Sequence, residues 1–334
     1  MKNTYILAIE SSCDETSAAI VKNGNSVVSC TVLSQIDIHT VYGGVVPEIA
    51  SRHHLKNITI IIEDCLNKAN MNMAEIDAIA VTYGPGLIGS LLVGLEAAKT
   101  LAFTLNKPLI PVHHILGHIF SNNLENEMKY PLIALVVSGG HTELILMSDA
   151  YSFEYLGGTL DDAVGECYDK VARVMGIGYP GGPLVDKLAV IGKNNYKLPV
   201  PLDDDTYNFS FSGLKSAVIN LIHNEEQRGI DINKEDLAAS FQNVVIEVLT
   251  KKTIKALKEY DIKNLILAGG VSANKGLRDR LSGLLENEDI NYIFPPFKYC
   301  GDNAAMIGAA GYYLYKNGIT STMALNAKSS EKLV

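Results

Sequence analysis

A strand–turn–strand pattern occurs twice in this chain, roughly half a chain apart, and it constrains the fold more than any other feature. Residues 4–9 and 16–21 are two β-rich runs that flank a short polar turn. Residues 131–137 and 142–147 repeat the pattern around the turn of residues 138–141. Internal repeats indicate the architecture. We therefore expect two related halves, each opening with a hairpin whose tip faces a shared cleft.

The rest of the chain alternates strands and helices, which places the fold in the α/β class. Strands are expected at 77–83, 109–112 and 265–270, and helices at 49–69, 91–105, 160–175, 212–224, 235–259, from 274 and at 304–315. The polar stretch 124–130 marks the expected domain boundary. This gives a first domain of residues 1–128 and a second of 129–303, with the last helix, about 304–330, packing back on the first.

Composition narrows the class of protein. The 334 residues are 47% hydrophobic, enough for two buried cores. A formal net charge of −9 disfavours a large non-specific nucleic-acid surface. The five cysteines include no C-x-x-C pair, which argues against a disulfide framework. No apolar run approaches the roughly 18 residues that span a membrane, and the start is too short for a signal peptide. We expect a cytoplasmic protein that does not associate with membranes.

A histidine pair gives the strongest chemical signal. His114 and His118 are four residues apart, so on a helix they share one face and can bind one metal ion. Asp302, just before the last predicted helix, is a candidate third ligand, although capping that helix is the more ordinary role for an Asp at this position. Two His and one Asp suit iron or zinc and leave positions open. The zinc-protease signature H-E-x-x-H is absent.

Residues 84–89 fit the pattern G-x-G-x-x-G between a predicted strand and a predicted helix. A dinucleotide-binding fold carries an acidic residue about 20 positions later, whereas residues 106–108 read Asn-Lys-Pro. A generic substrate or phosphate loop is therefore favoured. No G-x-x-x-x-G-K-[ST] sequence is present, so the chain is not a P-loop enzyme.

Glycines also follow two other predicted strands, at residues 138–140 and 268–274. Backbone N–H groups approach a phosphate or carboxylate closely at such turns, but either turn alone is equally consistent with a plain tight turn. Together with residues 179–183 they favour a nucleotide site. Asp169 and Asp186 would then accept ribose hydroxyl protons, the alternative being solvated helix carboxylates.

Two carboxylates lie at the predicted tip of the first hairpin. Asp14 and Glu15 would point into the same cleft and are candidates for a catalytic role, although turn residues commonly serve only the turn. The lysines at 251, 252, 255 and 258 form one charged helix face, most simply a solvated surface.

These motifs together resemble one family. The matching stretches, in chain order, are ESSCDET, GGVVPEIASRHH, GPGLIGSLLVG, HHILGH, VSGGHTEL, DDAVGECYDKVAR, YPGGP, SFSGLKSA, ASFQ, GGVSAN and GDNAAM. They are similar to the catalytic subunits of tRNA N6-adenosine threonylcarbamoyltransferase, a family formerly labelled O-sialoglycoprotein endopeptidases. The resemblance runs from Glu10 to about Ala310. It implies the fold of actin, sugar kinases and heat-shock chaperones, with two ribonuclease-H-like domains around a nucleotide cleft.

The resemblance also implies site residues. The resemblance implies that each subunit binds one divalent metal ion through His114, His118 and Asp302. Iron is favoured, and zinc is the alternative. The resemblance also implies a threonylcarbamoyl-adenylate site made by Val137, Ser138, Gly139, Gly140, His141, Asp169, Gly182, Asp186 and Asn274. Archaeal and eukaryotic relatives place a metal-binding Tyr where this chain has Val136, and Asn where it has His141. The chain therefore resembles the bacterial branch.

The reaction implied is acyl transfer. The exocyclic amine of adenosine 37, in tRNAs that read codons beginning with A, attacks the carbamoyl carbon, and AMP leaves. Bacterial relatives act with an inactive paralogue and a P-loop ATPase, while another enzyme makes the adenylate. Two alternatives stay open: a metalloprotease, which rests on the histidine pair alone, and a non-catalytic scaffold like the paralogue, which lacks the histidine motif that this chain keeps.

Overall fold

A computed structural model describes residues 3–333 and divides them into two compact units. The first unit comprises the chain up to Met128 together with the segment from Pro295 onward, and the second comprises Lys129–Phe294. Each unit contains one five-stranded mixed sheet. The predicted second domain extended to residue 303, whereas the structure returns the chain to the first unit at Pro295.

The sheet of the first unit has the strand order β3-β2-β1-β4-β5. Its strands are β1 (Tyr5–Glu10), β2 (Glu15–Lys22), β3 (Ser26–Ser34), β4 (Ala78–Gly84) and β5 (Leu109–His113). The first three are antiparallel neighbours, and β4 and β5 continue from β1 in parallel. Strand β1 is apolar without alternation because helices cover both of its faces, which is usual for central strands of α/β sheets.

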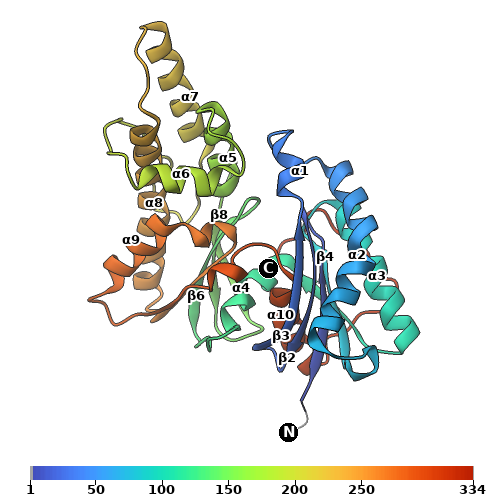
Figure 1. Cartoon of the computed structure of the whole chain (residues 1–334). Helices are drawn as coiled ribbons and strands as arrows, with labels where there is room; N and C mark the ends of the chain where they lie inside the picture. The colour runs from blue at the N-terminus through green and yellow to red at the C-terminus, as the bar shows by residue number, and fades with distance from the viewer. Residues whose placement is uncertain (1–2, 334) are drawn as a thin grey trace. The chain divides into compact units, whose positions relative to one another are not determined.

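Helices cover both faces of this sheet (Figure 1). The helices of the unit are α1 (Ile36–Thr40), α2 (Pro47–Ala69), α3 (Ile88–Leu105), α4 (His114–Phe120) and α10 (Ala304–Lys316). On one face, α2 and α3 pack against Leu7 and Ile9. On the other, α10 contacts β1 and β2. A Cβ built at Gly308 would lie 2.5 Å from Val21, so glycine allows α10 to approach the sheet this closely.

Helix α3 is the one helix among residues 3–333 that is long and apolar enough to cross a membrane, judged by length and composition alone. Its 18 residues have a mean hydropathy of 1.4. Glu96 and Lys99 lie within these 18 residues, so the helix is not an uninterrupted apolar run. In the structure α3 packs against β4 and α2, and its residues Leu95, Ala98 and Ala102 are buried in the core of the unit.

The second unit repeats the topology of the first. Its sheet has the order β10-β9-β6-β7-β8, with β6 (Leu132–Val137), β7 (Thr142–Met147), β8 (Phe153–Gly158), β9 (Asn264–Ala268) and β10 (Asn291–Ile293). The helices are α5 (Val164–Val174), α6 (Gly181–Ala189), α7 (Ser212–Gln227), α8 (Lys234–Glu259) and α9 (Lys275–Leu285). Strands β6 to β8 are antiparallel, and β9 and β10 are parallel. The predicted α/β repeat of hairpins is confirmed.

The lysine face of α8 differs from the prediction. Lys252 is only 4% exposed and donates to Asp204 Oδ1 at 2.8 Å and to the Thr206 carbonyl at 2.9 Å. Lys251 pairs with Asp203 at 2.5 Å, and Lys255 lies 3.6 Å from an Asp205 carboxylate oxygen. The acidic loop of residues 203–205 therefore neutralises much of this face, and it is not a plain solvated basic surface.

Candidate metal centre and substrate-binding residues

Helix α4 carries both histidines of the predicted metal site. It follows β5 directly and begins at His114, because the preceding His113 acts as its N-cap and accepts a hydrogen bond from the Ile115 N–H through Nδ1. The other ring nitrogen of His113 lies 3.1 Å from the Glu331 carbonyl. Both nitrogens of His113 are therefore occupied, and the helix presents His114 and His118 on one face.

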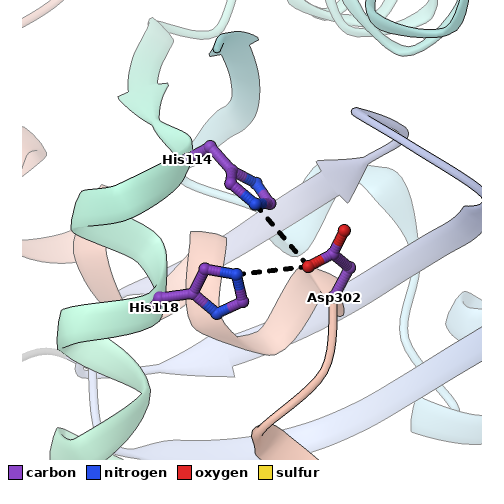
Figure 2. A group of neighbouring side chains, drawn as sticks. All are labelled: His114, His118 and Asp302. Carbon is purple, nitrogen blue, oxygen red and sulfur yellow. Dashed lines mark ion pairs between the residues drawn. The ribbon is translucent and has the colours of Figure 1, made fainter. Parts of the chain in front are cut away.

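The structure brings His114, His118 and Asp302 together (Figure 2). Asp302 Oδ1 lies 3.6 Å from His114 Nε2 and 3.2 Å from His118 Nε2. The capping alternative for Asp302 is wrong, because the neighbouring Asn303 caps α10 and accepts from the Met306 N–H at 3.0 Å. The Asp302 carboxylate is thereby available to the histidines.

Glu10 and Ser12 support His114 from the other side of its ring. Ser12 Oγ lies 3.1 Å and Glu10 Oε2 3.4 Å from His114 Nδ1, which leaves Nε2 toward Asp302. Glu10 is fully buried and also accepts from the Ser12 N–H and from Thr82 Oγ1, each at 2.5 Å. A carboxylate that holds the second nitrogen of a ligand histidine is a recurring feature of metal sites. Sequence reasoning missed both residues, although both belong to the ESSCDET motif.

Burial and nearby carboxylates set the protonation of the two histidines. Burial opposes the charge on His114, but Asp302 and Glu10 overcome it and raise its pKa to about 9. Burial lowers the pKa of His118. Neither ring nitrogen of the buried His118 has a hydrogen bond of good geometry among the described residues, although Nε2 faces Asp302. A neutral imidazole with an uncommitted nitrogen is the form that binds a metal ion.

The three side chains fit a divalent metal ion. Their ligand atoms all lie within 4.8 Å of one another. Donors about 2.0–2.2 Å from a tetrahedral ion are about 3.3–3.6 Å apart, and those of an octahedral ion about 3 Å. The observed 3.2 and 3.6 Å separations from Asp302 fall in this range. Two imidazoles and one carboxylate leave at least one position open, as in catalytic sites.

Asp14 and Glu15 lie at the tip of the β1–β2 hairpin, as predicted. Asp14 is buried, and Glu15 accepts from Ser34 Oγ at 2.9 Å. Burial, with the charges of Asp14 and Asp302, raises the pKa of Glu15 well above its usual range. Carboxylates with raised pKa values are common at functional sites.

The glycine loop of residues 84–89 supports the same hairpin turn. The Leu87 N–H donates to the Ser12 carbonyl at 2.8 Å, and a Cβ built at Gly86 would lie 2.6 Å from that oxygen. This packing accounts for the glycine at position 86 without a phosphate ligand. The loop thus positions Ser12, which contacts His114.

In the second unit, the Ser138–His141 turn joins β6 to β7. The Ser138 N–H donates to the His141 carbonyl at 2.8 Å, and the His141 N–H donates to Ser138 Oγ at 3.1 Å. No described heavy atom lies within 4 Å of a Cβ built at Gly139 or Gly140. Val137, the last residue of β6, is buried. The turn is fixed at its base and open above its two glycines.

The glycine turn after β9 lies beside this turn, because β6 and β9 are parallel neighbours. Gly269 has a φ of +90°, and a Cβ there would lie 2.4 Å from the Val137 carbonyl oxygen. The turn leads to Asn274, which caps α9 by accepting from the Leu277 N–H at 2.8 Å. The two predicted glycine turns are therefore adjacent at one edge of the sheet.

The remaining predicted substrate residues lie on helices α5 and α6 of this unit. Asp169 on α5 accepts from the Gly181 N–H at 2.7 Å, next to Gly182 in the first turn of α6. Asp186 on α6 accepts from the Lys275 N–H at 2.9 Å, at the start of α9. The structure thus connects Asp169 with the Gly182 turn and Asp186 with Asn274.

Comparison with known proteins decides the family. The family model described as tRNA N6-adenosine threonylcarbamoyltransferase (TsaD) matches residues 26–309. The chain belongs to this family. A tRNA N6-adenosine threonylcarbamoyltransferase of Staphylococcus saprophyticus is 61% identical over 97% of this chain and 95% of its own length. That of Staphylococcus carnosus is 60% identical over 98% and 96%.

Solved structures confirm the actin-like fold of this threonylcarbamoyltransferase family member. Full-length HypF covers 95% of the chain with a TM-score of 0.63 and 16% identity, the match spanning 47% of HypF. Component A of the (R)-2-hydroxyglutaryl-CoA dehydratase of Acidaminococcus fermentans covers 93%, with 98% of its own length, a TM-score of 0.55 and 14% identity. The family and fold predicted from the motifs are confirmed, while the ligand set and the substrate contacts stay predictions.

Proposed function

We propose that this chain transfers the threonylcarbamoyl group of threonylcarbamoyl-adenylate to the N6 amine of adenosine 37 in tRNAs reading codons that begin with A, releasing AMP. Membership of the transferase family supports the reaction class. The site rests on the cluster of His114, His118 and Asp302, because it brings three metal-binding groups together. Three protein ligands would leave coordination positions open for substrate.

His114 Nε2, His118 Nε2 and Asp302 would hold one divalent ion, iron by preference and zinc as the alternative. When bound, such an ion supplies Lewis-acid chemistry and a template for substrate oxygens. Glu10 and Ser12 orient His114 for this role by occupying its Nδ1.

The adenylate contacts would come from the second unit. The open glycine turn at Ser138–Gly140 would receive the phosphate or the threonyl carboxylate through backbone N–H groups. Val137 and His141 flank this turn, and Gly182 leaves space at the start of α6. Asp169, Asp186 and Asn274 would contact the adenosine moiety.

Asp14 and Glu15 are our candidates for accepting the proton of the attacking amine. A base works best when its pKa is near the working pH. Burial and the neighbouring carboxylates move the pKa of Glu15 in that direction. A divalent cation nearby would oppose this shift.

A nucleoside assay tests the reaction. Purified chain, its partner subunits, unmodified tRNA and threonylcarbamoyl-adenylate should yield N6-threonylcarbamoyladenosine, measured by mass spectrometry of digested tRNA. Glycosylated and plain protein substrates should stay intact, because H-E-x-x-H is absent from the sequence. Metal-dependent proteolysis that disappears in His114→Ala, with no nucleoside product, would establish the protease alternative instead.

We further propose that the chain works in the cytoplasm with an inactive paralogue and a P-loop ATPase, and that these partners complete the tRNA-binding surface. The net charge of −9 supports this, as does the pairing of Lys251, Lys252 and Lys255 with carboxylates. Arg278 is likewise engaged, donating to the Ser272 carbonyl at 2.6 Å. Cationic side chains on phosphates supply most non-specific affinity for nucleic acid.

The isolated chain is therefore expected to bind tRNA weakly and to turn over poorly, with both improving when the paralogue and the ATPase are added. Filter binding and the nucleoside assay, at one fixed ionic strength, measure the two effects. Tight tRNA binding and repeated turnover by the isolated chain would show that it needs no partner.

A further inference from the structure

The ASFQ motif, residues 239–242, has no part in the function described so far. It lies within α8, and three of its side chains have defined contacts. Ser240 Oγ accepts from the Tyr196 N–H at 3.0 Å, and Phe241 packs edge-on against Tyr168 with ring centroids 5.1 Å apart. These two contacts hold α8 within the core of the unit. Gln242, however, contacts two of the residues that we propose for the adenylate site.

Gln242 bridges Asp186 and Asn274. Its Nε2 donates to Asp186 Oδ1 at 2.9 Å, and its Oε1 accepts from Asn274 Nδ2 at 2.8 Å. Tyr168 OH lies 3.4 Å from the same Oε1. The side chain is buried, with Gln242 6% exposed and Tyr168 1% exposed. A buried amide that uses both ends in this way costs little to bury and fixes both neighbours.

The neighbouring side chains determine which end of the Gln242 amide faces Asp186 and which end faces Asn274. Asn274 Oδ1 accepts from the Leu277 N–H, so its amide nitrogen faces Gln242. An ionised Asp186 can only accept, so the Gln242 amide nitrogen must face it. Asp186 in turn accepts from the N–H groups of Lys275 and Gly276 at 2.9 and 3.4 Å. The hydrogen bonds form a closed ring around the start of α9.

The ring directs the Asp186 carboxylate. Oδ1 accepts from Gln242 and Gly276, and Oδ2 accepts from Lys275. A carboxylate offers about four acceptor positions in all, so Oδ2 keeps one for a further donor. A ribose hydroxyl is such a donor. Gln242 also keeps Asn274 in place beside it.

We infer that Gln242 is a positioning residue for the adenosine moiety of the substrate, acting through Asp186 and Asn274. The inference rests on the proposed adenylate site. Gln242 itself touches no substrate. Its loss removes the one side-chain donor of the three groups that hold Asp186 and leaves the Asn274 amide without its acceptor, so the two groups are held less firmly toward the nucleotide.

Calorimetric titration of the whole chain with AMP, the product that carries the adenosine, tests this. Gln242→Ala is expected to weaken AMP binding about ten- to a hundredfold, the effect of losing a hydrogen bond to a charged group. The KM for threonylcarbamoyl-adenylate should rise by a similar factor with little change in kcat. Metal content should be unchanged, since the variant lies outside the first unit.

Thr250→Val is the matched control. Thr250 is buried on the same helix and donates only within it, to the Ile246 and Glu247 carbonyls. It should lower the melting temperature without changing AMP affinity. If Gln242→Ala does not fold, Gln242→Glu replaces it. That variant keeps the shape but sets a carboxylate against Asp186, and the same loss of AMP affinity is expected.

The outcomes distinguish failure of the proposed adenylate site from failure of the positioning role of Gln242. If Asp186→Ala and Asn274→Ala bind AMP like the wild type, the adenylate site is misplaced and the inference fails with it. If those variants lose affinity while the Gln242 variant binds normally, the site stands and the positioning role is overturned. An equal loss of AMP affinity in Thr250→Val would show that general destabilisation causes the effect, and it would also overturn the positioning role of Gln242.

Discussion

His118→Ala is expected to empty the metal site and to reduce threonylcarbamoyl transfer to the background level. His118 is fully buried, and its Nε2 is 3.2 Å from Asp302. Removing it leaves two ligands, too few to hold an ion in a site built from two imidazoles and one carboxylate. Elemental analysis of protein reconstituted with Fe(II) or Zn(II), together with the nucleoside assay, measures both effects.

The neighbouring His113 provides the matched control. It is buried and lies in the same motif, but its nitrogens are used by the Ile115 N–H and the Glu331 carbonyl. His113→Ala removes an N-cap, a change that costs about 0.5–2 kcal/mol of stability, and should retain the metal ion. Equal metal content in wild type and His118→Ala would refute the ligand assignment.

Glu10→Gln is expected to weaken metal binding by about ten- to a hundredfold, the usual cost of losing a partner of a ligand histidine. The glutamine keeps the shape of the fully buried side chain. The Ser12 N–H donates to Oε1 and favours the glutamine oxygen there, so the amide nitrogen would take the place of Oε2, which contacts His114 Nδ1 and Thr82 Oγ1. A donor in this place favours the tautomer with its proton on Nε2, the nitrogen that the ion needs.

Competition with a chelator at one fixed pH measures this affinity, since protons and metal ions compete for imidazole. Thr82→Val is the control variant. This substitution removes the 2.5 Å hydrogen bond to Glu10 but keeps the carboxylate beside His114. The loss of metal affinity should therefore be smaller than in Glu10→Gln. Unchanged affinity in Glu10→Gln would show that Ser12 alone orients the ring.

Much of the fold was predictable because its signals are local. The two hairpins were visible as apolar runs around polar turns. The histidine pair was visible because residues four positions apart lie on the same face of a helix. Helix α6 was missed because it begins at Gly181-Gly182-Pro183, residues that are typical of loops. Strand β3 was missed because Ser and Thr interrupt its apolar residues.

The supporting residues of the site were not predictable in this way. Glu10 and His114 are 104 positions apart, and Asp186 and Gln242 are 56 apart. Nothing in the local sequence shows that Glu10 contacts His114 or that Gln242 contacts Asp186. The Asp302–Asn303 pair shows the same limit, because both residue types cap helices well and only the geometry shows that Asn303 does so.

The return of the chain to the first unit has a consequence for biosynthesis. A ribosome makes the chain from its N-terminus, and domains fold as units in that order. Here the second unit, Lys129–Phe294, is contiguous and complete before the first, which lacks α10 until residues 304–316 are made. Asp302 emerges with that helix. The proposed metal site is therefore assembled only after the second unit has been made, and a metal ion could bind there only once Asp302 has been synthesised.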